Sequence, residues 1–131
     1  MNVSTWFFRF GVLAVIVGVG LGMWMGEQEN FTLAPVHAHL NLVGFVLPFI
    51  FGLFYRSFPA VSGGLLPKLH LVLSILGVLT MIPALGAMLL GDKTYVPFLI
   101  AGELATGLGL LIFAVQVYRG TGKAAAAQPQ A

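Results

Sequence analysis

Long apolar runs dominate the pattern of hydrophobic and polar positions along the chain. Four such runs occupy residues 5–26, 33–55, 67–90 and 95–118. Each has about 20 residues or slightly more, and a helix of about 20 residues crosses a hydrocarbon core at 1.5 Å per residue. Because the runs are continuously apolar and show no alternation, they do not indicate the strands of a membrane β-barrel. The pattern predicts an all-α fold, an integral membrane bundle of four transmembrane helices.

Composition agrees with a membrane protein. Of the 131 residues, 59% are hydrophobic and 8% are charged, and no soluble domain of this size needs so apolar a surface. The lipid bilayer is therefore the expected partner, whereas the few scattered basic residues exclude a nucleic-acid surface. The chain has no cysteine, which excludes disulfides and thiolate metal sites. We expect one four-helix domain over residues 1–119, followed by a disordered alanine-rich tail over residues 120–131.

Charged residues mark the ends of the apolar runs. The basic side chains at one set of ends are Arg9, Arg56, Lys68, Arg119 and Lys123. The charged side chains at the opposite ends are Glu27, Glu29, Asp92 and Lys93. The positive-inside rule then predicts that both termini are cytoplasmic. We expect the membrane to be a bacterial inner membrane.

Glycines recur at helical spacing within the first run. Gly11, Gly18, Gly22 and Gly26 fall on one helix face because seven or four residues separate them. Small residues let helices approach closely in lipid. This face is therefore expected to pack tightly against a neighbouring helix.

The candidate chemistry begins with the stretch His37-Ala-His39-Leu-Asn41, at the head of the second run. Polar side chains inside a membrane are costly without partners, so they indicate a functional site. A helix turns by about 100° per residue, which places His37 and His39 on nearly opposite sides and favours two separate ligands over one chelate. Asn41 shares the face of His37 and is a candidate partner of its ring. The alternative is that both imidazoles lie in the interface and bond to water and headgroups.

Glu103 is the one acidic residue well inside a run. It lies about 12 Å into the fourth helix, close to the depth of His39, about 9 Å into the second. It could carry protons or orient a ligating imidazole, or it could be a protonated acid that bonds between helices. Met25, with Met23 and Met88, lies on the same side and has a thioether able to ligate haem or copper. The alternative for these methionines is ordinary packing.

Three spaced motifs resemble a known family. They are His37-Ala-His39-Leu-x-x-x-Gly44-Phe45, Phe51-Gly52-Leu-Phe-Tyr55-Arg56-x-Phe58-Pro59 and Lys68-Leu-His70-x-x-Leu73-x-x-x-Gly77. In this order they resemble part of the catalytic subunit (subunit I) of haem-copper oxidases, above all the C-type oxidases and nitric oxide reductases. The resemblance covers the second and third runs, about half of the chain. It implies that His37 and His39 are axial ligands of two haems, with haem b as the cofactor and electron transport as the setting.

The chain also departs from that family. The catalytic subunit has many more helices and further histidines for copper or non-haem iron, whereas this chain has three histidines in all. We therefore expect no complete oxygen-reducing or nitric-oxide-reducing site in one chain. The resemblance implies a small haem-binding membrane protein with an electron-transfer, gas-binding or haem-handling role. Its expected partners are further copies of itself or a larger respiratory complex.

Three other functions stay open. A copper- or zinc-binding or assembly protein could use the same two histidines with methionines. A minimal proton-coupled transporter could use Glu103. A structural subunit of a respiratory complex would need neither the two histidines nor Glu103. His70 begins the third helix about 25 Å from the level of His39, and we expect it to bond at the membrane interface rather than to ligate haem.

Overall fold

The computed structural model describes residues 2–126, and this part of the chain is helical with no strand. The elements are α1 (Val3–Glu27), α2 (Ala34–Asn41), the π-helical segment η1 (Leu42–Val46), α3 (Leu47–Ser57), the 3-10 turn η2 (Pro59–Val61), α4 (Leu65–Leu89) and α5 (Val96–Ala126). Because α2, η1 and α3 follow without a break, they form one span. Four helical spans are thus long and apolar enough to cross a membrane. The prediction of an all-α protein with four such helices is confirmed.

The end of α5 differs from the expectation. The helix continues to Ala126, so residues 120–126 are helical where the sequence predicts a disordered tail. Alanine has the highest helix propensity of all residues, and a run of alanines extends an existing helix readily. The rest of the predicted tail, residues 127–131, lies outside the described residues.

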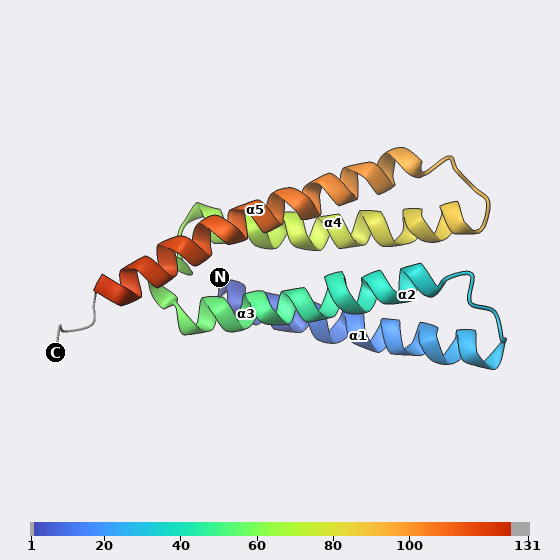
Figure 1. Cartoon of the computed structure of the whole chain (residues 1–131), viewed down its shortest axis with the longest axis horizontal. Helices are drawn as coiled ribbons and strands as arrows, with labels where there is room; N and C mark the ends of the chain where they lie inside the picture. Colours follow the sequence, from blue (N-terminus) through green and yellow to red (C-terminus); the bar gives the residue numbers. More distant parts are fainter. Residues whose placement is uncertain (1, 127–131) are drawn as a thin grey trace.

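The helices form two antiparallel hairpins that lie side by side (Figure 1). One consists of α1 and the span α2–η1–α3, and the other of α4 and α5. The start of α1, the loop between α3 and α4, and the last part of α5 lie at one end of the bundle, the N-terminal end. The starts of α2 and α5 lie at the other, the His37 end. The largest interface joins α4 to α5, and α4 also touches α1 and α2.

The first hairpin closes over the glycine face of α1. A Cβ atom added at Gly11 would lie 2.7 Å from the Phe49 ring, and one at Gly22 would lie 2.7 Å from His37 Cε1. At Gly18 an added Cβ would overlap the Asn41 side chain. The predicted tight packing is therefore present at these three positions, whereas Gly26 faces open space.

Small residues also join α4 to α5. A Cβ at Gly77 would overlap the Thr106 hydroxyl, and a Cβ at Gly102 would lie 2.6 Å from Thr80 Oγ1. Each glycine thus leaves room for a threonine side chain of the opposite helix. This close approach makes the contact between α4 and α5 the largest of the bundle.

Proline causes the π-helical segment. Pro48 has no N–H to bond the carbonyl four residues earlier, so the helix cannot continue there with its usual ladder. Instead the Leu47 N–H bonds to the carbonyl of Leu42, five residues back. π-Helical turns of this kind occur frequently at functional sites, and this one follows Asn41 directly.

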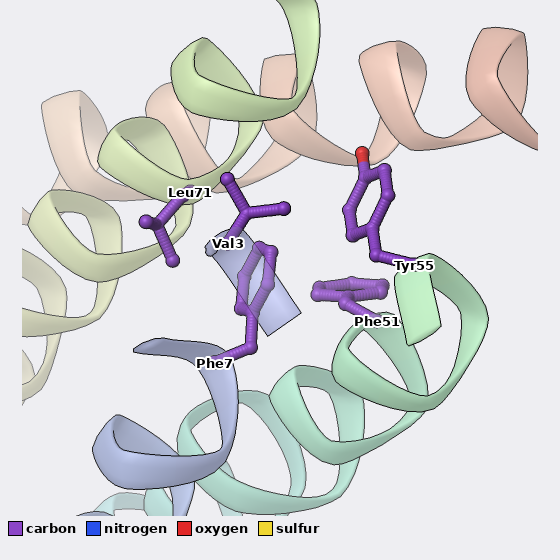
Figure 2. Packing of buried hydrophobic residues seen from close by; sticks show 5 residues of the cluster. All are labelled: Val3, Phe7, Phe51, Tyr55 and Leu71. Carbon is purple, nitrogen blue, oxygen red and sulfur yellow. The ribbon is translucent and has the colours of Figure 1, made fainter. Parts of the chain in front are cut away.

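The bundle buries aromatic side chains at its N-terminal end and exposes aliphatic ones on its outside. Figure 2 shows Phe7 of α1 packed against Phe51 and Tyr55 of α3, together with Val3 and Leu71. Large apolar side chains that point outward include Leu13, Ile16, Leu104 and Leu111, each exposed by more than 60%. An outer surface of this kind suits contact with lipid.

Candidate functional site

His37 and Asn41 hold α2 against α1. The imidazole of His37 is half-buried, and its Nδ1 lies 2.8 Å from the carbonyl oxygen of Gly18. The Asn41 amide donates to the carbonyl of His37 at 2.9 Å and also lies 3.3 Å from His37 Nε2. The four-residue spacing predicts this contact, and the two glycines of α1 leave the room for it.

The Gly18 carbonyl fixes the tautomer of His37. A carbonyl oxygen only accepts hydrogen bonds, so Nδ1 carries the proton and donates it. The lone pair then lies on Nε2. The Asn41 amide nitrogen lies 3.2 Å from Nδ1 and 3.3 Å from Nε2, so it packs against both ring nitrogens and is not directed at this lone pair. The ring is packed between Asn41 and Gly22, which leaves its Nε2 little access to an external ligand.

His39 has the same tautomer in a different setting. Its Nδ1 lies 2.7 Å from the carbonyl oxygen of Pro35 and therefore donates to it. The side chain is exposed, on the side of α2 that faces away from α1. Its Nε2 lone pair is therefore open to a ligand from outside the chain. Metal-ligating histidines commonly use one ring N–H to bond a backbone carbonyl in this way.

The other predicted site residues do not gather around these histidines. Glu103 lies within the span formed by α5 and is exposed on the outside of that helix, so the chain itself does not enclose it. Met25 is buried at 3% exposure, whereas Met23 is 73% exposed. Residues 2–126 contain no group of three or more histidine, cysteine or acidic side chains that could hold a metal ion. A single outer site built by all four helices is therefore not formed within one chain, because α5 turns Glu103 outward.

The apolar groove beside α2 does not include its histidines. An apolar groove of about 450 Å³ lies between α1, α2 and α4, and its walls include Leu40 but neither His37 nor His39. The chemistry of His39 fits an axial haem ligand, and its side chain is exposed and not enclosed by the described part of the chain. A haem on His39 would lie against the outer face of α2 and would need a second subunit to cover it.

His70 lies in a second polar site, in the half of the bundle at the N-terminal end. It is fully buried, which corrects the expectation of an interface residue. Its Nδ1 lies 2.9 Å from the Tyr55 hydroxyl. The rings of Phe7, Phe51 and Phe113 surround it, with centroids 5.0, 4.5 and 5.3 Å away. The aromatic cage forms because these rings come from three helices that meet at this level.

Sequence reasoning missed this second site, although a signal was present. Ser74 and Gly77 follow His70 by four and seven residues, so all three share one helix face. Thr106 and Gly109 follow the same period on α5. A stripe of small and polar residues on two successive apolar helices predicts a close helix contact with a polar interior.

Comparison of the chain with protein-family models, with curated proteins and with solved structures finds no match in any of the three.

Proposed function

We propose that this protein binds haem b in a membrane, with His39 as an axial ligand to the iron. The observation that supports this most is the fixed tautomer of His39, whose Nδ1–H is held by the Pro35 carbonyl while Nε2 is open. An imidazole that is held in this way has the orientation and the basicity of an axial ligand. The likeness of the His37 and His70 motifs to haem-copper oxidases also supports haem over another cofactor.

His37 and Asn41 have a positioning role in this proposal. Both residues connect α2 to α1, and the His37 ring is packed against Asn41 and α1. A haem on His37 would have to separate the two helices, since the ring packs against Gly22. We therefore assign haem ligation to His39 and the orientation of α2 to His37.

A bound haem would supply a one-electron redox centre or a site for a diatomic gas. The chain lines one side of that haem site. The second axial ligand and the side chains that cover the haem would therefore come from another subunit. We infer that this subunit is a second copy or a member of a larger respiratory complex. Copper is the alternative occupant of His39, because imidazole also suits copper.

The positions of the basic residues predict the orientation of the bundle in the membrane. Arg56 and Lys68 flank the loop between α3 and α4, and Arg119 lies in α5 near the same end of the bundle. Under the positive-inside rule the N-terminal end faces the cytoplasm, and His39 lies in the outer half of the bacterial inner membrane. Cysteine labelling from each side of intact cells tests this orientation, and no native cysteine interferes.

The test of haem binding is an absorption spectrum. Protein purified from cells supplied with haem should show a Soret band that shifts on reduction with dithionite. His39→Ala should lose or alter the band, whereas His70→Phe should keep it. A colourless preparation, or a His39→Ala spectrum identical to that of the unmodified protein, would overturn the proposal. Metal analysis that finds copper without haem would replace haem with copper.

A further inference from the structure

Two buried polar atoms have no hydrogen-bond partner in the described part of the chain, and both lie between α4 and α5. They are His70 Nε2 and Thr106 Oγ1. Buried polar atoms are nearly always bonded, and a missing partner commonly indicates a water. The cost of leaving both unbonded in an apolar interior would be several kcal/mol. The two unbonded atoms therefore indicate that water enters the interface between α4 and α5.

A polar cavity reaches Tyr55, the hydrogen-bond partner of His70. It has a volume of about 490 Å³ and opens at the N-terminal end of the bundle. Its polar lining residues are Asn2, Ser4, Thr5, Tyr55, Arg56 and Ser62. Tyr55 closes its inner side with a ring that is only 1% exposed. The Tyr55 hydroxyl then bonds His70 Nδ1 at 2.9 Å, which connects the cavity to the imidazole.

Gly109 leaves a gap on the other side of the imidazole. The position that a Cβ of Gly109 would occupy lies 3.6 Å from His70 Cδ2 and 3.2 Å from Ser74 Oγ. Cδ2 is bonded to Nε2, so the unpartnered edge of the ring faces the same gap as the serine hydroxyl. The missing side chain therefore leaves a space that His70 and Ser74 both border.

A small cavity continues the route. It has a volume of about 10 Å³ and is lined by Ser74 and Thr106, together with apolar residues of η1, α3 and α5. A space of this size holds about one water, and such a water could bond both hydroxyls. Thr106 lies one helical turn from Glu103, whose side chain is exposed. Glu103 is about 10 Å from the start of α5, a depth at which charged side chains reach water by snorkelling and local thinning.

We propose that these residues form a proton pathway from the cavity at the N-terminal end to Glu103. The order is Tyr55, His70, Ser74, a bound water, Thr106 and Glu103. A proton from water in the cavity binds the Tyr55 oxygen while the Tyr55 hydroxyl proton passes to His70 Nδ1. The Nε2 proton of His70 then passes through bridging water to Ser74, and from there through Thr106 and water to the Glu103 carboxylate, because neither His70 Nε2 nor Thr106 Oγ1 has a partner in the described residues. Each group receives one proton and releases one, and a change of tautomer returns His70 to its starting state.

The surroundings restrict this route to protons. Phe7, Phe51 and Phe113 cover the imidazole, and the one-water cavity is too small for a hydrated ion. None of the pathway residues is a proposed haem ligand, so the pathway stands whether or not His39 binds haem. It differs from a transporter that depends on Glu103 alone, because it assigns the entry to Tyr55 and His70.

Proton flux into liposomes tests the proposal. The full chain is reconstituted with a pH-sensitive dye inside, and a potassium diffusion potential drives protons inward. The unmodified protein should conduct faster than protein-free liposomes. Tyr55→Phe, His70→Phe and Glu103→Gln should each reduce the flux to the protein-free rate. Gly109→Ala should do the same with every polar group intact, because its methyl group fills the gap between His70 and Ser74.

Gly107→Ala is the matched control. It makes the same substitution two residues away, where nothing lies within 4 Å of the added methyl group, and it should conduct normally. Circular dichroism and gel filtration identify variants that fail to fold, and Gly109→Ala keeps the test decisive if His70→Phe is among them. Unmodified protein that conducts no faster than empty liposomes would overturn the pathway. So would Gly109→Ala with unchanged flux.

Discussion

Two histidines that each form a hydrogen bond at Nδ1 have opposite surroundings. His39 bonds a carbonyl of its own helix and is exposed on the outside of α2. His70 bonds the Tyr55 hydroxyl and is enclosed by aromatic rings from three helices. In each case the partner at Nδ1 determines that Nε2 is the remaining reactive atom. Access then determines what this atom can do: a large ligand can reach His39, whereas only a proton or a water can reach His70.

The two halves of the bundle also differ in how they are held together. The half at the N-terminal end has a core of buried aromatic side chains. The His37 end has a smaller aliphatic cluster around Val36 and Met81, together with glycine contacts and hydrogen bonds between α1 and α2. Substitutions should therefore have different costs in the two halves. The predictions that follow begin with the largest expected effect.

Truncation of the aromatic cluster should be the most damaging change. Phe51→Ala removes a ring that is 3% exposed and contacts Phe7, His70 and Phe113. We expect the free energy of unfolding to fall by about 3–5 kcal/mol, as for other buried Phe→Ala changes. Unfolding in mixed detergent micelles measures this loss. Leu53→Ala, two residues along the same helix and 55% exposed, should change stability by less than about 0.5 kcal/mol; equal losses in the two variants would show that the cluster is not the core.

Enlarging a glycine of α1 should have the next largest effect, and it should act at the His37 end. In Gly22→Ala the new methyl group would approach His37 Cε1 to 2.7 Å, so α2 or the imidazole must move. Overpacking of this kind costs about 1–3 kcal/mol. The same unfolding assay applies, with Gly20→Ala as control because nothing lies within 4 Å of that position. If both variants were equally stable, α1 and α2 would not pack through this face.

Removal of the Tyr55 hydroxyl should cost less. Tyr55→Phe keeps the ring in place and takes away only the partner of His70 Nδ1. We expect a loss of about 1 kcal/mol, the usual net contribution of one hydrogen bond. Nitrogen-15 NMR of labelled histidine should also show a changed His70 ring signal. An unchanged ring signal would mean that the hydroxyl does not bond the imidazole.

His39→Ala should have the smallest effect on stability. The side chain is exposed and bonds only within its own helix, so we expect a change of less than about 0.5 kcal/mol. The variant should therefore be folded and suitable for ligand measurements. A large loss would mean that His39 has a structural role, as we assign to His37.

The sequence predicted the fold well because membrane spans have a simple physical basis. Length and continuous apolarity identify the four helices, and the spacing of Gly11, Gly18 and Gly22 identifies the face on which α1 packs. The π-helical segment was not predicted, although Pro48 supplies its cause. The helical ending of α5 differs from the prediction because alanines extend a helix that already precedes them.

The site was harder to predict, because helix rotation about the bundle axis decides which polar groups meet. The 100° step separates His37 from His39 correctly, but it does not show which of them faces α1 and which faces outward. Depth alone placed Glu103 beside His39, whereas the packing of Gly102 on Thr80 turns Glu103 to the outside. His70 was placed at the interface because it begins a helix, and the rings that bury it come from α1, α3 and α5, far from it in sequence.

The most direct test of the haem proposal is a titration of haem into the purified apoprotein in lipid nanodiscs, followed by absorption. The unmodified protein should develop a saturable Soret band at a fixed haem-to-protein ratio. His39→Ala, although equally stable, should show only the spectrum of haem in nanodiscs without protein, and His70→Phe should bind haem as the unmodified protein does. If His39→Ala bound haem with unchanged spectrum and affinity, or if the unmodified protein bound none, His39 would not be a haem ligand.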